Sequence, residues 1–200
     1  MRHNAPTTQT TKAEETQLRI LTAAAKDASA HGIGSLTFGG LAKSMKMSKS
    51  GIYAHFGSVE RLQIDVMKFI SQQFLEQVVA PTFSAPKGRA RLKAVMQNLL
   101  AWSAHEDRPG GCQILAANFE NDLLKGQVRE KLIEQIETWR GVLSSLMGDA
   151  CQQENDLTID PDHAVAFLIG LYTTQHIERL LLGEDMAQER ALKLWLTYIS

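Results

Sequence analysis

Between Thr37 and Leu62 the chain reads as two short helices joined by a tight turn, followed by the start of a third helix. The spacing of its apolar residues suits two helices that cross, and the residues beside the turn suit helix ends. A short helix presented after such a turn is the element that helix-turn-helix proteins place in the major groove of DNA. This segment makes a DNA-binding regulator the leading hypothesis.

The residues of this segment explain how it would hold together. Thr37 and Ser48 are suited to accept hydrogen bonds from free backbone N–H groups at the starts of the first and second helices. Ala42 is small at the point where the two helices should approach most closely. The apolar residues expected between the helices are Leu41, Met45, Met47 and Ile52.

The pattern resembles the DNA-binding domain of the tetracycline-repressor (TetR) family. That family's motif runs threonine, an aliphatic-alanine pair, a turn, serine, and then tyrosine-x-histidine-phenylalanine. The residues that match in register are Thr37, Leu41, Ala42, Ser48, Ile52, Tyr53, His55 and Phe56, and the match continues through Ser58, Glu60 and Leu62. The resemblance is specific over about 26 residues and extends as a helix pattern over roughly the first 75. The rest of the chain resembles the family in length and helical character.

Two positions depart from the family pattern. Lys46 stands at the turn position that is usually glycine, and Val59 stands where a phosphate-binding lysine is common. If Lys46 has a positive φ, the conformation costs on the order of 1 kcal/mol. The alternatives are a different turn geometry, or a lysine retained for a phosphate contact.

Composition agrees with an all-α chain and a basic N-terminal part. Ala, Leu, Gln and Glu are common and only five residues are proline, which favours helices. Residues 1–75 contain nine Lys/Arg and five Asp/Glu, a net charge of +4, whereas residues 76–200 contain twelve and seventeen, a net charge of −5. The absence of a long apolar run or a signal-peptide core, together with only two cysteines, Cys112 and Cys151, predicts a cytoplasmic protein with free thiols and no membrane partner.

We expect four regions: a flexible tail (1–12), a helix-turn-helix domain (13–57), a linking helix (58–80) and a helical regulatory and dimerisation domain (81–200). The first helix should run from about residue 14 to 31, burying Leu18, Leu21, Ala25 and Ala28. The linking helix, capped by Ser58, should end near Val79, with Pro81 and Pro86 breaking the chain after it. It starts in the DNA-binding domain and ends in the second domain, so it should connect the two mechanically.

The second domain shows further helical periodicity. We predict a helix that buries Leu92, Val95, Met96, Leu99 and Trp102, a short helix over 112–120 after Pro109-Gly110-Gly111, and a long helix over about 127–150. Asp160 and Pro161 are suited to the N-cap and first position of the next helix. The last helix should cover about 186–199.

Residues 164–172 are apolar on nearly every side, so a helix there must be covered all round. Either this is a core helix of one chain, or a second subunit supplies the cover. The resemblance implies the second arrangement, a homodimer formed by the last two helices. The interface residues it implies are Phe167, Gly170, Leu171, Leu192, Trp195 and Ile199.

A two-fold dimer would place its recognition helices about 34–36 Å apart on a partly palindromic operator in double-stranded DNA. By resemblance, Tyr53 and His55 contact phosphates, and Thr37, Ser48 and Lys46 can add phosphate contacts. Lys49, Ser50 and Gly51 should face the groove, where Lys49 can donate to guanine and Gly51 allows close approach to a thymine methyl. The plainer alternatives are a partly buried Tyr53, a structural His55 and a merely solvated Lys46.

The resemblance also implies a small-molecule effector bound among the C-terminal helices. Candidate lining residues are Phe74, Met96, Trp102, His105, Cys112, Phe119, Trp139, Tyr172 and His176. Aromatic residues and methionines at helical spacing are more often simple core residues. Cys112 is either a reactive thiol or an inert core residue.

Two other function classes fit the sequence less well. Enzyme activity is not expected, because His105, Glu106 and Asp107 are consecutive and point in different directions, and no phosphate loop or metal-ligand pair accompanies them. We accordingly expect no cofactor and no metal. The other alternative is a helical interaction protein whose helix-turn-helix docks onto a protein instead of DNA. The sequence thus predicts a ligand-responsive, homodimeric transcriptional regulator, expected to be a repressor.

Overall fold

The computed structural model describes residues 11–120 and 123–200, and every regular element within those ranges is helical. The tail expected over residues 1–12 falls, for residues 1–10, outside the described residues. Thr11 already forms the N-cap of the first helix, where its hydroxyl accepts from the Glu14 backbone and the Glu14 carboxylate accepts from the Thr11 N–H at 2.7 Å. Together these two bonds form a capping box that fixes the start of that helix.

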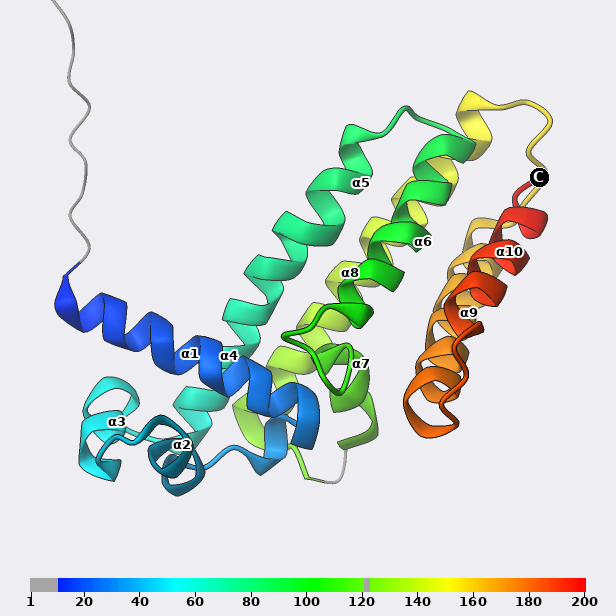
Figure 1. Ribbon diagram of the computed structural model, residues 1–200. Coiled ribbons are helices and arrows are strands. Elements are labelled where there is room, and N and C mark those ends of the chain that lie inside the picture. The colour runs from blue at the N-terminus through cyan, green and yellow to red at the C-terminus, as the bar shows by residue number, and fades with distance from the viewer. Residues whose placement is uncertain (1–10, 121–122) are drawn as a thin grey trace, which may run out of the picture.

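The N-terminal part is a group of one 20-residue helix and several shorter ones at one end of the molecule (Figure 1). Its elements are α1 (Lys12–His31), η1 (Ile33–Ser35), α2 (Phe38–Met45) and α3 (Lys49–Phe56). Their shared core contains Ile20, Ala24, Leu41, Ile52 and Phe56, each at most 5% exposed. Of the four residues expected on the buried face of α1, Ala25 and Ala28 are buried, whereas Leu18 is 52% exposed and Leu21 only half-buried. Ile20 and Ala24 complete the buried face.

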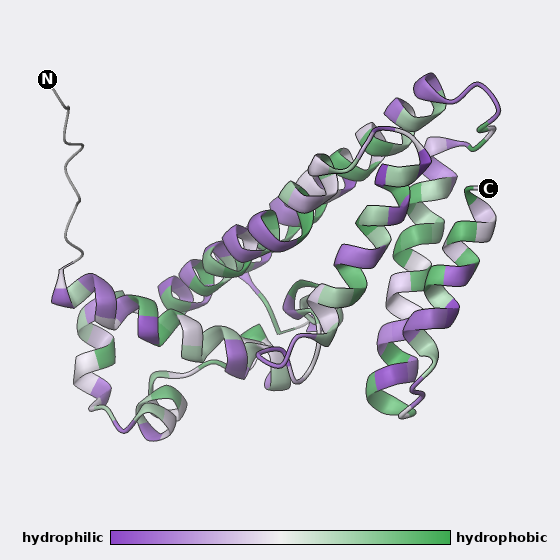
Figure 2. Ribbon diagram, turned by 45° about the horizontal axis from the view of Figure 1, so that its top comes forward, coloured by the Kyte–Doolittle hydropathy of each residue, from purple (hydrophilic) through white to green (hydrophobic). Residues whose placement is uncertain are grey.

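The remaining helices build the larger part of the molecule, in which long helices lie side by side (Figure 1). They are α4 (Val59–Phe74), η2 (Leu75–Val79), α5 (Ala80–Ser84), α6 (Arg89–Ala104), α7 (Gln113–Ala117), η3 (Asn118–Glu120), α8 (Gly126–Gln153), α9 (Pro161–Leu181) and α10 (Ala187–Tyr198). Hydrophilic and hydrophobic residues alternate along the long helices (Figure 2), as amphipathic helices with one buried face require. The apolar stripe expected on α6 is buried from Leu92 to Trp102.

The expectation that Pro81 ends the linking helix is wrong. Helical backbone continues from Val59 to Ser84, because η2 is a turn of π-helix immediately before the proline. A π-turn shifts the hydrogen-bond register, so the missing N–H of Pro81 and the bulk of its ring are accommodated without a break. The chain leaves helical conformation at Ala85 (φ −72°, ψ 151°), the residue before Pro86.

Helix α9 begins as its sequence predicts. The Asp160 carboxylate accepts from the His163 backbone N–H at 2.8 Å, and Pro161 occupies the first helical position. Helices α9 and α10 pack together as an antiparallel pair at the end of the molecule opposite α1–α3 (Figure 1). Among residues 11–120 and 123–200, no helix combines the length and apolarity that a bilayer crossing requires.

Candidate DNA-binding surface and effector cavity

The turn between α2 and α3 is built by two side-chain caps and one left-handed residue. The Thr37 hydroxyl accepts from the Gly40 N–H at 3.1 Å, and the Ser48 hydroxyl accepts from the Gly51 N–H at 3.0 Å. Lys46 has φ 54° and ψ 40°, and the following N–H, of Met47, donates to the Ala42 carbonyl at 3.0 Å. This is a Schellman ending of α2, in which a lysine occupies the position that favours glycine.

Helix α3 has one face in the core and one face outside. Ile52 and Phe56 are buried, whereas Lys49, Ser50 and Tyr53 are exposed. The Tyr53 ring packs edge-on against Phe38 with ring centroids 5.9 Å apart, yet 57% of the residue remains exposed.

The eight residues expected at DNA lie on three neighbouring segments: the start of α2, the turn and α3. Thr37, Lys46 and Ser48 are exposed, and Gly51 and His55 are half-buried. The geometry therefore presents a short helix with a polar outer face and a basic turn, which is what insertion into a major groove requires.

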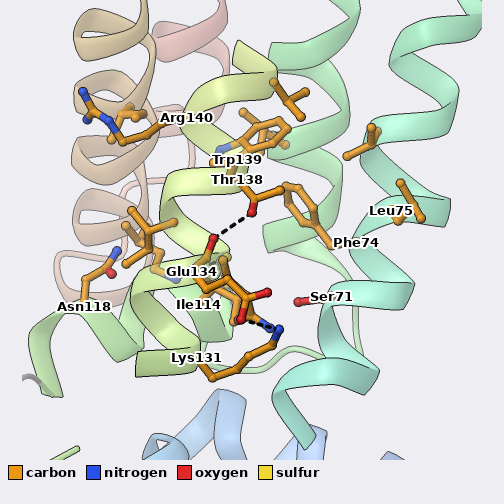
Figure 3. Close-up of a pocket in the computed structure, with 18 of the residues that line it drawn as sticks. Ser71, Phe74, Leu75, Ile114, Asn118, Lys131, Glu134, Thr138, Trp139 and Arg140 are labelled. Atoms are coloured by element: carbon orange, nitrogen blue, oxygen red, sulfur yellow. Dashed lines mark hydrogen bonds and ion pairs between the residues drawn. The ribbon is translucent and has the colours of Figure 1, made fainter. Parts of the chain in front are cut away.

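A cavity of about 650 Å³ lies between α4, η2, α6, α7, α8 and α9. Figure 3 shows the Phe74 and Trp139 side chains next to each other in its wall, where their rings meet edge to face with centroids 4.9 Å apart. Much of the remaining wall is aliphatic and comes from Leu75, Val79, Leu99, Ile114, Leu115, Ile136, Val142 and Ile169. This volume suits a drug-sized molecule.

The polar part of the cavity wall is more basic than acidic. It contains three cationic side chains, Lys68, Lys131 and Arg140, and one carboxylate, Glu134, which pairs with Lys131 at 2.7 Å. Tyr172 lies in the wall at 6% exposure, and burial raises the pKa of its phenol well above the usual value. Its hydroxyl therefore stays protonated at neutral pH.

Of the nine candidate lining residues, the cavity wall contains Phe74, Cys112, Trp139 and Tyr172. Met96 and Trp102 are fully packed core residues, although Trp102 supports the wall by packing edge-on against Phe74 at 5.3 Å. The three that lie elsewhere are Phe119, which is 71% exposed, His105, which lines a smaller cavity, and His176, whose ring lies near Gly111. Sequence reasoning concentrated on aromatic residues and missed the aliphatic wall, which only the packing of five helices brings together.

Helix α7 and the residues around it join this cavity to α1. The Gln113 side-chain amide donates to the Ala25 carbonyl at 3.2 Å. The Ser29 hydroxyl donates to the Gly111 carbonyl and accepts from the Gly110 N–H, both at 3.0 Å. A Cβ at Gly110 would lie 1.7 Å from the Ser29 carbonyl oxygen, so only glycine allows this approach.

Glu120 also connects the two parts of the molecule. Its two carboxylate oxygens accept from the backbone N–H groups of Ile33 at 3.0 Å and Gly34 at 2.6 Å. From the other side, the Gln63 amide on α4 donates to the Ile33 carbonyl at 3.2 Å. The segment Gly110–Glu120 thus touches both the cavity and the helix-turn-helix domain.

A helix-turn-helix domain joined to a separate helical domain with an internal cavity defines a class of DNA-binding transcriptional regulators. Residues 20–63 match the model of the bacterial regulatory proteins of the tetR family, and residues 88–195 match a tetracyclin repressor-like C-terminal domain. The second match covers more than half of the chain. The protein therefore belongs to the TetR family.

Several relatives and solved structures agree with this assignment. The nucleoid occlusion factor SlmA of Vibrio cholerae is 31% identical over 110 residues, which cover 54% of this chain and 55% of SlmA. The chain thus spans about half the length of the curated relatives it matches. A TetR transcriptional regulator from Chloroflexus aurantiacus has the same fold, with a TM-score of 0.82 and 21% identity over 94% of this chain and 96% of its own. AibR, solved with isovaleryl coenzyme A and operator DNA, has a TM-score of 0.71 and 19% identity over 91% of this chain and 96% of its own.

Proposed function

We propose that this protein is a homodimeric, effector-responsive transcriptional repressor that acts in the cytoplasm on a partly palindromic operator. The observation that carries the proposal is the outer face of α3. Lys49 and Ser50 stand exposed at its N-terminal end, where recognition helices of this motif contact base edges. On the opposite face of the helix, Ile52 and Phe56 are buried in the core.

The exposed residues have two expected roles, contact with phosphates and recognition of bases. We propose that Tyr53 and His55 on α3, together with Thr37 and Ser48, contact phosphates, and that Lys46 adds a positive charge at the turn; all except the half-buried His55 are exposed. Phosphate contacts set position and register, whereas groove-facing side chains set sequence preference. We assign base reading to Lys49, with Ser50 and Gly51 beside it.

The proposed dimer uses the outer faces of α9 and α10. Phe167, Ile177, Leu181 and Leu194 are between 36% and 78% exposed, an apolar surface that a single chain leaves uncovered. Gly170 is exposed on the same helix, and a Cβ there would meet nothing within 4 Å, so a partner helix has room to approach closely.

Four other residues expected at the interface lie inward of this surface. Trp195 and Ile199 are 0% and 2% exposed, and the Trp195 indole donates to the Leu92 carbonyl at 2.7 Å. Neither side chain has surface to offer a partner, so both are core residues of one chain. Leu171 and Leu192 are half-buried against the same core.

We propose that the large cavity binds an apolar effector that carries an acidic group. The aromatic and aliphatic wall suits the apolar body. Lys131 and Lys68 pair with Glu134 and Asp65, so Arg140 is the cation of the wall that we expect to bind the negative group. Effector binding can affect the DNA-binding domain by two routes. One is α4, whose last residue, Phe74, lies in the cavity wall with Leu75 directly after it. The other is the segment Gly110–Glu120.

A mobility-shift titration on the gene's own upstream DNA, with non-specific competitor at low and moderate salt, tests the DNA-binding part of the proposal. The double variant Tyr53→Phe/His55→Ala should weaken binding about equally on all sequences, whereas Lys49→Ala should relax preference at one operator position. Identical effects of the two changes would overturn the assignment of Lys49. Loss of all binding under competitor would favour docking of the helix-turn-helix onto a protein.

The dimer has its own test in light scattering after size exclusion. The wild-type mass should be twice 22.2 kDa. Ile177→Glu should lower it toward one chain, because a charge would be buried at the interface. Phe83→Glu is the matched control, since Phe83 is similarly exposed at 43% but lies on α5. A monomeric wild type, or equal effects of both variants, would contradict the proposed surface.

A further inference from the structure

A second, smaller cavity of about 70 Å³ lies where α1 meets the rest of the molecule. Its walls come from α1, from α4 and η2, from the loop after α6, and from α7. The charged and amide groups around it include Lys26, Gln77, His105, Asp107, Arg108 and Gln113. No residue of this cavity belongs to the wall of the larger one.

Arg108 is the unusual member of this group, because it is a buried cation. It is 4% exposed, and its guanidinium carbon lies 3.4 Å from the centroid of the Trp102 ring. Its nitrogens donate to the Gln77 side-chain oxygen at 2.9 Å and to the Trp102 carbonyl at 3.4 Å, while Nε has no hydrogen-bond partner. Within the described ranges, no carboxylate forms an ion pair with it at 4.0 Å or less.

A buried guanidinium without a counter-ion is costly, and removing a charge from water is only partly offset by an aromatic face. Burial accordingly lowers the pKa of Arg108, although an arginine remains protonated at neutral pH. Asp107 contributes a carboxylate to the cavity wall, but this carboxylate pairs with Lys26 at 3.3 Å and lies 3.7 Å from His105 Nδ1. Asp107 is 63% exposed, so water screens its charge.

We propose that this cavity binds a small oxyanion, with Arg108 as the buried counter-ion and Lys26 as a second cation at the rim. The volume of about 70 Å³ exceeds what a single water molecule needs and suits a tetrahedral oxyanion or a short carboxylate. Inorganic phosphate, sulfate and acetate share this chemistry and are the probes to compare. Because Lys26 lies on α1 and Arg108 on the loop after α6, the bound ion bridges the two parts of the molecule. The effect of the bound anion on DNA binding rests on the function proposed above, whereas the binding of the anion to the cavity does not.

The binding test uses the full-length protein without DNA. Each anion is titrated against sodium chloride at equal ionic strength, and both thermal unfolding and the Trp102 indole signal in a ¹⁵N correlation spectrum are followed. We expect a saturable rise in Tm, about 3–5 °C at ten times the Kd, together with a saturable shift of the Trp102 signal. Equal rises with chloride, or a rise that never saturates, would show a general salt effect and overturn the proposal.

Charge variants identify the site. Arg108→Gln should abolish the saturable effect, and Lys26→Gln should weaken anion binding about two- to fivefold, the change expected of one exposed charge. Asp107→Asn should strengthen binding by a similar factor, because it removes an acidic group from the cavity wall. Lys87→Gln, an exposed lysine in the distant loop after α5, is the matched control and should change nothing. If Arg108→Gln does not fold, the opposite effects of the Lys26 and Asp107 variants decide, and their absence refutes the site.

Saturating anion should also change operator affinity if the bridge couples to the DNA-binding domain. Anion binding with no change in operator affinity would leave the site standing and overturn the coupling. Absence of operator binding under every condition would instead overturn the proposed function and leave the anion site unaffected.

Discussion

Replacement of Lys46 by glycine should stabilise the protein, although it removes a side chain from the proposed DNA-binding surface. Lys46 has φ 54°, and a non-glycine residue in the left-handed region costs about 1–2 kcal/mol relative to its ordinary conformations. Glycine also gives the unfolded chain more freedom, which offsets about 0.4–1 kcal/mol of that gain. The net expectation is about 0.5–1 kcal/mol, or roughly 2–3 °C in Tm for a chain of this length.

Lys46→Ala is the matched control, because alanine keeps the Cβ that causes the strain and removes the same charge. Thermal unfolding should place this variant within about 0.5 kcal/mol of the wild type. Both variants should lose the same operator affinity, and the slope of log affinity against log salt should become shallower by about 0.9 per protomer if Lys46 contacts a phosphate. Equal stability of the two variants would refute the backbone argument, and an unchanged salt slope would refute the phosphate contact.

Three further substitutions test contacts between segments that are far apart in the sequence. Glu120→Gln replaces the charged acceptor of two backbone N–H groups and should lower the free energy of unfolding by about 1–2 kcal/mol in a denaturant titration. Trp195→Phe should cost a similar amount by the same measurement, since it removes the 2.7 Å bond to the Leu92 carbonyl; no loss would argue against this bond. Gly110→Ala should separate the loop from Ser29 and weaken the response of operator binding to effector, whereas unchanged regulation in the mobility-shift assay would argue against this route.

The helix-turn-helix domain could be predicted closely from sequence because its determinants are local. A cap at Thr37 or Ser48 depends on residues within three positions, and a helix ending at Lys46 depends on the preceding turn. A motif of about 26 residues therefore contains nearly all the information that builds it. Even the unusual lysine was visible as a departure, although its left-handed conformation was one of several alternatives until the structure was known.

The cavity and the long-range contacts of Arg108 and Glu120 could not be predicted in this way. Periodicity shows that a residue such as Trp102 or Trp139 is buried, but not whether it faces a neighbouring helix or a cavity. That distinction depends on how helices far apart in sequence are rotated against each other. Arg108 and Glu120 are harder still, because their partners lie 31 and 87 positions away. Nothing in their local sequence distinguishes them from solvated charges.

If the cavity binds an effector, as proposed, these long-range contacts set how strongly it can act on the DNA-binding domain. An effector changes operator occupancy only by the difference between its binding free energies in the two states, and allosteric coupling is typically about 1–3 kcal/mol. The Glu120 carboxylate accepts two charge-assisted hydrogen bonds, each worth about 1.5–3 kcal/mol, and the Ser29 hydroxyl makes two neutral ones, each worth about 1 kcal/mol. If movement of α7 breaks even some of these hydrogen bonds, the free energy that is lost is as large as the coupling required. The linking helix α4 is therefore not the sole route proposed. Beside Cys112 and Ile114 of the cavity wall, the Gln113 side chain donates to the Ala25 carbonyl and the Ser29 hydroxyl on α1 donates to the Gly111 carbonyl.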